Sequence, residues 1–291
     1  MLVFIIPVKH PARCRSYSGV TQLLEETLRS VCRQTKDDFR VIVVSNETPK
    51  YSEEFRNTFF VEVDFPPPPI PSAIEEEYTH IYLDKGCKQA VGLLESKRFN
   101  PTHIMFVDAD DVVSCHLADF VGARSLRPGW FMEKGWVFSN LSKLIEERNS
   151  FWSYCGTSHI LRRDLLKIPD SISSRCTQQE LIDAIGSDYV MRILGDHNRY
   201  RQVCTSQGAP LEPLPFIGAI WRADTGENSS RVVWDQRRFG PIWGQNVTPA
   251  IKDEFGLNPG KRSVKETLLT NLWRARHLMA RMVKSTFRYE N

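Results

Sequence analysis

The sequence predicts an α/β fold in which a mostly parallel sheet is flanked by helices. Three observations favour this fold. Short apolar runs, which are typical of buried strands, recur in the first part of the chain. Longer stretches between them carry apolar residues at helical spacing. Finally, a cluster of acids follows one apolar run, and open α/β sheets bind their ligands beyond the carboxyl ends of the strands.

The composition is that of an ordinary globular chain. Its 291 residues suffice for one large domain or two small ones, and 41% are hydrophobic and 25% charged. The net charge of +3 gives no argument for a nucleic-acid partner, and we expect none. Seven widely spaced cysteines without a C-x-x-C pair indicate free thiols in a reducing compartment. The apolar start lacks the basic region of a signal peptide and is too short to span a bilayer, so we expect a cytoplasmic protein.

The first part of the chain predicts elements in an order that builds a parallel sheet. In chain order these are a strand over residues 2–8, a helix over 23–34, strands over 39–45 and 60–65, a helix from Lys85, and a strand over 104–107. The first three form a strand, helix, strand unit, which implies a parallel crossover. A proline-rich run after the fourth element ends that strand, because no central strand accommodates it.

Weaker patterns follow in the second half. Residues 151–163 predict a strand that turns into a helix, and residues 219–231 predict a strand that leads into a polar turn. Gly, Pro and Asn are frequent over residues 241–262, which predicts a linker. Residues 263–288 predict a basic amphipathic helix. It either packs on the domain with a solvated basic face or docks on an anionic membrane surface, which would place the protein peripherally at the inner face of a membrane.

Asp108, Asp110 and Asp111 directly follow the last strand predicted in the first half. Three carboxylates so close together repel one another unless a cation or hydrogen-bond donors offset their charge. Hard oxygen ligands of this kind suit Mg²⁺ or Mn²⁺, above all when a substrate phosphate completes the coordination shell. An EF-hand is excluded, because Val112 and Val113 stand where it needs a polar ligand and a glycine. A solvated acidic turn and the nucleophile motif of haloacid-dehalogenase phosphatases remain as alternatives.

Five segments resemble the GT-A glycosyltransferases, in particular their large inverting family of nucleotide-diphospho-sugar transferases. They are residues 4–8, residues 24–30 with Gln34, residues 41–44, Lys85 with Gly86, and residues 106–111. The resemblance covers about the first 115 residues. It implies a GT-A-type, Rossmann-like domain with a nucleotide-sugar-binding half over residues 1–115 and an acceptor and catalytic half over residues 116–240. Residues 241–291 would then be the linker and the C-terminal basic amphipathic helix.

The resemblance also implies a reaction, which is the metal-assisted, inverting transfer of a sugar from a nucleotide diphosphate sugar to a hydroxyl. A UDP-sugar is the favoured donor, and the acceptor would be a sugar, a lipid-linked or another hydroxyl compound. Asp108 and Asp110 would hold Mn²⁺ or Mg²⁺, with His197 as a further candidate ligand against the alternative of a solvent-exposed loop histidine. The residues implied at the donor are Pro7, Val8, Asn46, Glu47, Lys85, Asp108 and Asp110. The family often places an Asp after its second strand to read the base, and this chain has Asn46 and Glu47 there instead.

An inverting transferase needs a general base for the acceptor hydroxyl. In the family that the chain resembles, this base is an acid that opens a helix well after the metal motif. Asp188 matches it, because it follows Gly186 at a predicted helix start. The alternative is that Asp188 only caps its helix. Arg222 and Arg231 are candidate partners for the donor diphosphate.

Two other functions stay open at this point. A haloacid-dehalogenase-like phosphohydrolase would use Asp108 as its nucleophile, but Tyr200 stands where the second acid of its downstream Gly-Asp-x-x-x-Asp motif is expected. A non-catalytic nucleotide-sugar-binding module would keep the sheet without the chemistry. The two predictions separate in a simple assay, because many transferases hydrolyse their donor slowly and a pure binder does not.

Overall fold

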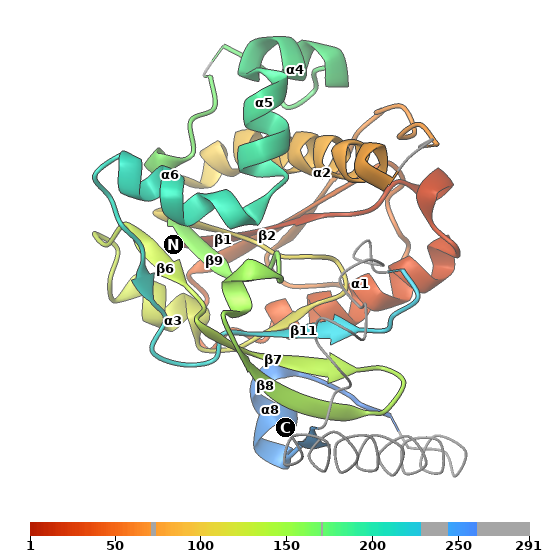
Figure 1. The fold of residues 1–291 in the computed structure, drawn as a ribbon, viewed down its shortest axis with the longest axis vertical. Coiled ribbons are helices and arrows are strands. Elements are labelled where there is room, and N and C mark those ends of the chain that lie inside the picture. Colours follow the sequence, from red (N-terminus) through yellow and green to blue (C-terminus); the bar gives the residue numbers. More distant parts are fainter. Residues whose placement is uncertain (71–73, 170, 228–243, 261–291) are drawn as a thin grey trace, which may run out of the picture.

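The computed structural model describes residues 1–70, 74–169, 171–227 and 244–260. Within them, seven strands form the main sheet in the order β10-β6-β9-β4-β1-β2-β3 (Figure 1). Their bounds are β1 (Leu2–Pro7), β2 (Phe39–Ser45), β3 (Thr58–Glu62), β4 (His103–Phe106), β6 (Gly129–Phe131), β9 (His159–Arg162) and β10 (Glu212–Pro213). Among these seven, β9 alone runs antiparallel to its neighbours. The predicted α/β fold with a mostly parallel sheet is confirmed, and the arrangement is the one expected of a GT-A-type domain.

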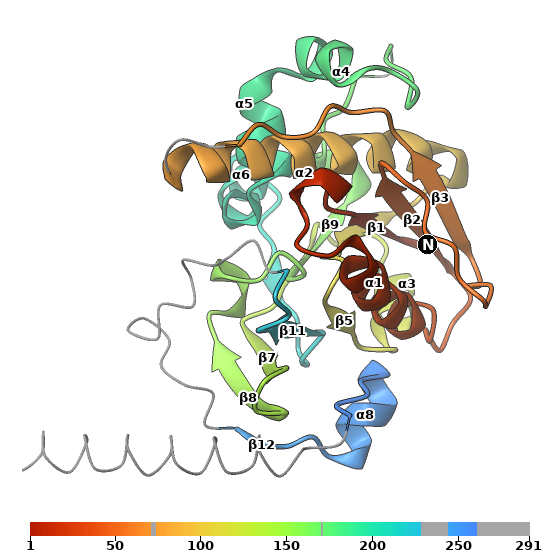
Figure 2. The same cartoon turned by 90° about the vertical axis from the view of Figure 1, so that its right-hand side faces the viewer.

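Helices cover both faces of this sheet, and the pleat of β1 shows how the core divides. Leu2, Phe4 and Ile6 pack in the cluster with α1 and α3, whereas Val3 and Ile5 pack in the cluster with α2. Figure 2 shows α2 across one face and α1 with α3 on the other. The helices are α1 (Tyr17–Val31), α2 (Ile74–Ser96), α3 (Leu117–Gly122), α4 (Gln178–Ile185), α5 (Ser187–Tyr189), a π-helical turn (Val190–Leu194) and α6 (Tyr200–Ser206). The last four lie on the α2 side of the sheet.

The first two helices begin earlier than predicted. Helix α1 starts at Tyr17, because the Ser16 hydroxyl accepts the N–H of Gly19 at 3.1 Å and caps the first turn. Between Tyr17 and Gln22, Val20 is the one aliphatic residue that is buried, so the apolar helical spacing does not extend to the N-terminal turn of α1. Helix α2 likewise extends N-terminal to Lys85, from Ile74.

A second sheet of five strands, in the order β12-β8-β7-β11-β5, lies against the first within the described residues. Its strands are β5 (Val112–Val113), β7 (Lys134–Ser139), β8 (Leu144–Asn149), β11 (Ala219–Ala223) and β12 (Gln245–Asn246). The strand predicted at the start of residues 219–231 is confirmed as β11. Because β5 begins directly after Asp111 and pairs with β11, the second sheet forms next to the acidic cluster.

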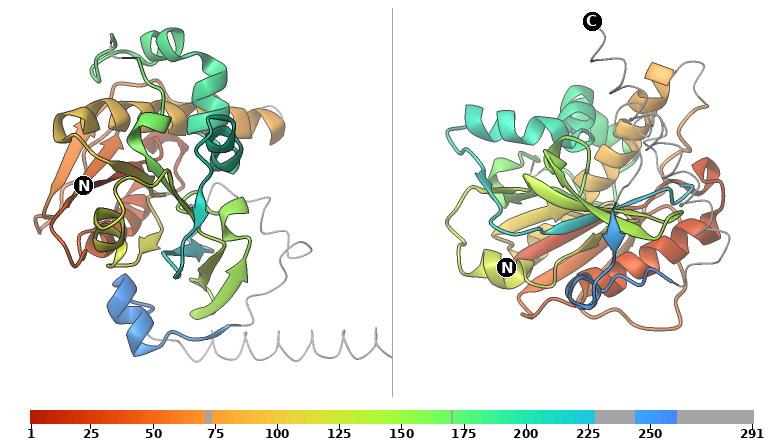
Figure 3. Two further views of the ribbon diagram at one scale, coloured as in Figure 1. Left: turned by 90° about the vertical axis from the view of Figure 1, so that its left-hand side faces the viewer. Right: turned by 60° about the horizontal axis from the view of Figure 1, so that its bottom comes forward.

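The predicted linker over 241–262 holds a helix, α8 (Pro249–Phe255). Thr248 caps it, Pro249 opens it, and Ile251 and Phe255 are buried against the second sheet. Figure 3 shows α8 at the end of the molecule opposite α4. The prediction missed this helix because it has seven residues and only two core positions, too few to show a helical period.

The prediction for residues 151–163 is confirmed in part. A short 3-10 turn (Phe151–Ser153) comes first, and the strand β9 then leads directly into a second 3-10 turn (Arg163–Leu165), where the prediction had a strand from the start of the segment. The predicted basic helix over 263–288, the membrane-docking surface assigned to it, and Arg231 lie outside the described residues. In the part of the chain that the structure describes, no helix combines the length and apolar character needed to cross a bilayer.

Candidate functional site

A cavity of about 500 Å³ opens at the carboxyl ends of β1 and β4. Its volume is in the range typical of small-molecule sites. Six of the residues predicted from the sequence line it, namely Pro7, Val8, Lys85, Asp108, Asp110 and His197. The position agrees with the rule that open α/β sheets bind ligands beyond the carboxyl ends of their strands.

Asp108 is fixed at the end of β4 by two contacts. Its backbone N–H donates to the Thr157 hydroxyl at 2.9 Å, and its carboxylate is bound by the ammonium of Lys85 from α2. Burial lowers the pKa of Lys85, but the charge of Asp108 outweighs this effect and raises it, so the ammonium is held charged. A Cβ at Gly156 would lie 2.4 Å from the Asp108 carboxylate and 2.8 Å from the Lys85 ammonium. Glycine at this position therefore allows the ion pair to form.

Asp110 is half-buried. The ammonium of Lys85 pairs with Asp108, so the negative charge of Asp110 is not balanced by this ion pair. Burial, and next the charge of Asp108, raise the pKa of Asp110 to about 6. The Thr225 hydroxyl donates to its Oδ2 at 3.3 Å. A pair of carboxylates beside one ammonium retains negative charge, and a divalent cation with oxygen ligands fits this arrangement.

The third acid, Asp111, is a structural residue. It is fully buried, and its Oδ1 accepts the backbone N–H of Arg222 at 3.1 Å, whereas its Oδ2 accepts the Thr157 hydroxyl at 2.6 Å. The thiol of Cys155 donates to the same oxygen at 3.4 Å. Burial, followed by the charges of Asp110 and Asp108, raises the pKa of Asp111 well above its usual range. Asp111 thus holds β11 and the 155–157 loop against the acidic turn.

His197 lies on the cavity wall near Lys85 and Asp108. Burial, and next the charge of Lys85, lower the pKa of His197 to about 4, so its imidazole is neutral at pH 7. Its Nε2 is buried and has no hydrogen-bond partner among the described residues. In that same part of the chain, no three His, Cys, Asp or Glu side chains are grouped closely enough to hold a metal ion by themselves. A cation at Asp108 and Asp110 would therefore need further oxygen ligands from a bound molecule.

Asn46 and Glu47 do not line the cavity. The amide of Asn46 donates to the backbone carbonyls of Val63, at 3.2 Å, and Phe65, at 2.9 Å, so it ties the end of β2 to the chain beyond β3. Glu47 is exposed, and its backbone carbonyl accepts the Tyr17 hydroxyl at 2.6 Å. Both residues shape the edge of the sheet, and their assignment to the donor stays a prediction.

Asp188, the predicted general base, lies at an exposed position outside the cavity lining. It stands in the first turn of α5, its side chain is 77% exposed, and its carboxylate pairs with Arg192 at 2.9 Å. It is absent from the cavity lining, whereas a general base must come within hydrogen-bond reach of its substrate. The geometry gives the base assignment no support. Arg222 does not line the cavity, because it is buried and pairs with Glu26 at 2.5 Å, although its charge acts on Asp110 and opposes the rise in the pKa of that acid.

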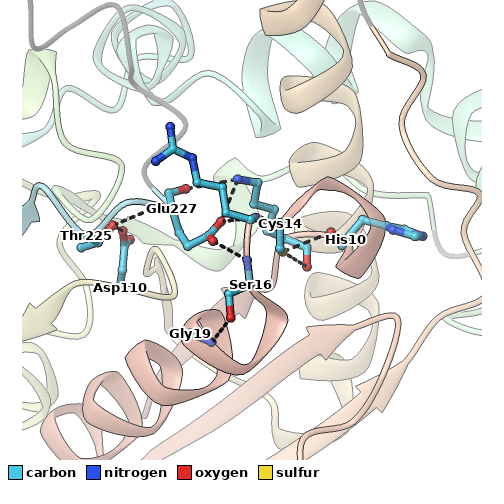
Figure 4. Close-up of polar contacts among 9 residues, drawn as sticks. His10, Cys14, Ser16, Gly19, Asp110, Thr225 and Glu227 are labelled. Carbon is cyan, nitrogen blue, oxygen red and sulfur yellow. Dashed lines mark hydrogen bonds and ion pairs between the residues drawn. The ribbon is translucent and has the colours of Figure 1, made fainter.

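Sequence reasoning missed two ionic contacts of the cavity. The ammonium of Lys88 is fully buried and donates to Asp84 and to the Val8 carbonyl, both at 2.8 Å. Asp84 and Lys88 are four residues apart on a helix, and this spacing was the sequence signal for the ion pair. The second contact is that of Glu227, which reaches back to Lys9 and the chain before α1 (Figure 4). No sequence signal could reveal it, because more than 200 residues separate the partners.

Comparisons with known proteins give a fold likeness alone. No protein-family model and no curated protein matches the chain. Among solved structures, the chain is similar to two crystal structures of S. aureus TarS, each with 12% identity, a TM-score of 0.41 and 76% of this chain covered. The match covers 60% of the TarS 1-349 structure and 36% of the other TarS structure, so the chain spans less than two thirds of either. A likeness of this degree says nothing about donor, acceptor or metal.

Proposed function

We propose that the chain is a glycosyltransferase that moves a sugar from a nucleotide diphosphate sugar to a hydroxyl acceptor. The observation that carries the proposal is the pairing of Asp108 and Asp110, at the end of a central parallel strand, with the ammonium of Lys85 in one cavity. Negative and positive groups placed together suit a diphosphate that binds through a divalent cation on one side and an ammonium on the other.

The cation proposed for this site is Mn²⁺ or Mg²⁺. Asp110 and Asp108 would hold it together with oxygens of the bound diphosphate, and His197 of the same cavity is a further candidate ligand. When bound, the cation would supply Lewis-acid stabilisation of the leaving diphosphate. Lys85 contributes a charge that the protein keeps in place through Asp108. Because this charge is positioned before the reaction, the developing negative charge of the leaving group is stabilised without reorganisation.

The acceptor side of the proposal rests on aromatic rings. Tyr154 and Trp221 line the cavity, and their ring centroids lie 5.4 Å apart. Aromatic rings offer flat apolar surfaces on which the C–H face of a sugar packs, while hydroxyls remain free to form hydrogen bonds. Asp108 and Asp110 line the same cavity, so a sugar held on these rings would share it with the acids.

Thermal melting with nucleotide diphosphates is the decisive first experiment. A ligand that binds the native state raises the melting temperature by mass action. We expect a shift with UDP that requires Mn²⁺ or Mg²⁺, and we expect Asp110→Asn to remove it. Asp119→Asn, at an exposed acid on α3, is the matched control and should keep the full shift. If no nucleoside diphosphate, including GDP and ADP, shifts the melting temperature with metal present, the proposal fails.

Release of sugar from the donor separates the remaining functions. A transferase hydrolyses its UDP-sugar slowly when the acceptor is missing, and the variant Asp110→Asn should lose this reaction. Metal-dependent UDP binding without any hydrolysis would indicate a binding module. Release of phosphate from a simple phosphate monoester, without use of a UDP-sugar, would indicate a phosphohydrolase.

A further inference from the structure

The carboxylate of Glu227 is bound by groups from the N-terminal part of the chain, between Lys9 and Ser16. Its Oε1 accepts the N–H of Ser16 at 2.8 Å, and its Oε2 accepts the N–H of Arg15 at 3.2 Å. The ammonium of Lys9 lies 3.4 Å from Oε2 and donates to the Glu227 carbonyl at 3.2 Å. Although Glu227 lies next to an exposed glycine, its side chain is 9% exposed. Two consecutive N–H groups and an ammonium thus form a seat for an oxyanion (Figure 4).

This seat belongs to the same cavity as the acid pair. Lys9, Arg15 and Glu227 all line it, and Arg13 adds a further cation on the same segment. The seat also lies just before α1, whose 15 aligned peptide units favour negative charge at this end. The cavity therefore combines this cationic segment with the carboxylates of Asp108 and Asp110.

Two hydrogen bonds connect the seat to the acid pair. The N–H of Glu227 donates to the Thr225 hydroxyl at 3.3 Å, and that hydroxyl donates to Asp110 at 3.3 Å. Figure 4 shows the three side chains in a row between the acidic turn and the start of α1. A molecule that binds at Asp110 would meet Thr225 first, and Glu227 next.

A phosphoryl group presents the same kind of oxygen as a carboxylate and carries more negative charge. It would form the contacts that Glu227 now forms, with a stronger attraction to Lys9. We propose that Lys9, Arg15 and Ser16 form a phosphate subsite, which Glu227 fills when no ligand is bound and leaves when a substrate phosphoryl group enters. This inference rests on the proposed function for the source of that group, which is either the donor diphosphate or a phosphate on the acceptor.

Binding of inorganic phosphate to the full chain, measured by calorimetry without metal, tests the subsite. Glu227→Gln keeps the size of the side chain and removes the charge that competes for the seat. If Glu227 fills the seat nine-tenths of the time, its removal tightens phosphate binding by about tenfold. Adding Lys9→Ala to Glu227→Gln should reverse the gain. Glu212→Gln, at an exposed glutamate paired with Arg127, removes the same charge elsewhere and should change nothing.

A competition experiment then identifies the source. If phosphate and UDP exclude one another in Glu227→Gln, the subsite serves the donor diphosphate. If both bind together, it serves a phosphate on the acceptor. Either result supports the subsite, and Glu227→Asp, which shortens the reach of the carboxylate, should repeat the tightening if Glu227→Gln does not fold.

The inference is overturned if folded Glu227→Gln binds phosphate no better than the unaltered chain, or if Glu212→Gln tightens binding equally. Neither result bears on the proposed function, because phosphate binding is measured without metal or sugar. Conversely, a chain that never binds UDP with Mn²⁺ would refute the transferase and leave the phosphate measurement unaffected.

Discussion

The ammonium of Lys85 binds the carboxylate of Asp108, and Gly156 lies so close to both groups that a side chain at this position would collide with them. The pair joins α2 to the end of β4, and beside it burial, and next the charge of Asp108, raise the pKa of Asp110 to about 6. The ion pair therefore fixes the position of the Lys85 ammonium, and its Asp108 carboxylate contributes to the raised pKa of Asp110.

The first prediction concerns Gly156→Ala. Its methyl group would lie within 3 Å of both partners of the ion pair, so Lys85 or Asp108 has to move. We expect turnover to fall by at least about tenfold, because small displacements of positioning groups are costly in catalysis. Donor hydrolysis rates measure this. Gly122→Ala is the control, since a methyl group there meets nothing within 4 Å. Equal rates for both variants would contradict the assigned role of the glycine.

The second prediction concerns the stability of Asp110→Asn. A carboxyl group whose folded pKa is raised to about 6 binds protons more tightly folded than unfolded, so its contribution to stability is lost as pH rises from about 4 to about 6. At pH 7 the ionised group opposes folding, and the neutral amide should raise the melting temperature while it removes the response to UDP and Mn²⁺. A lower melting temperature, measured at pH 7, would argue for a structural role.

The third prediction separates Asp111 from its neighbours. Asp111→Ala leaves the N–H of Arg222 and the hydroxyl of Thr157 without their buried acceptor. The free energy of unfolding should drop by about 3 kcal/mol. Urea unfolding followed by tryptophan fluorescence measures the loss. Stability equal to that of Asp110→Asn would show that all three acids serve the ligand.

The fourth prediction concerns Asp188→Asn. The Asp188 side chain is exposed and pairs with Arg192 in one turn of helix, and such surface pairs contribute little to stability. Turnover and melting temperature should both stay close to those of the unaltered chain. Loss of transfer with intact donor binding would restore Asp188 as the general base and require α5 to approach the acceptor in the complex.

The fifth prediction is a pH dependence from His103. Burial lowers its pKa to about 4, and its Nε2 lies 2.9 Å from the carbonyl of Arg127. A histidine with a lowered folded pKa takes up its proton more readily when unfolded, so stability is complete above about pH 6.5 and falls toward pH 4. We expect the melting temperature to drop by about 4 °C between pH 7 and pH 5 from this residue. His103→Gln should lose that part of the drop, and an unchanged profile would refute it.

The sequence allowed the centre of the fold to be predicted because the central strands are buried on both faces. Residues in β1, β2 and β4 have almost no exposed surface, so their apolar runs stand out and end where the strands end. The acids after β4 were identified for the same reason. By contrast, the prediction began the second helix at Lys85 and overlooked Ile74, Tyr78, Ile81 and Tyr82, which recur at helical spacing before it.

The predicted base shows what a local pattern omits. A glycine followed by an acid indicates correctly that a helix begins near Asp188, but the direction in which this helix faces depends on its packing against α2, where Gly86 accommodates the Val190 carbonyl. Glu227 shows the complementary case, because nothing near it in the sequence refers to Ser16. Contacts between distant parts of the chain decide which acids enter the cavity.

The position of α8 has a practical consequence for shortening the chain. The Ser114 hydroxyl, four residues beyond Asp110, donates to Glu254 at 2.6 Å, and Arg33 at the end of α1 donates to the carbonyl of Asp253 at 2.9 Å. A fragment cut at residue 240 would lose this cover and expose the apolar underside of the second sheet to aggregation. A stable fragment has to extend at least to Leu257, which is 4% exposed.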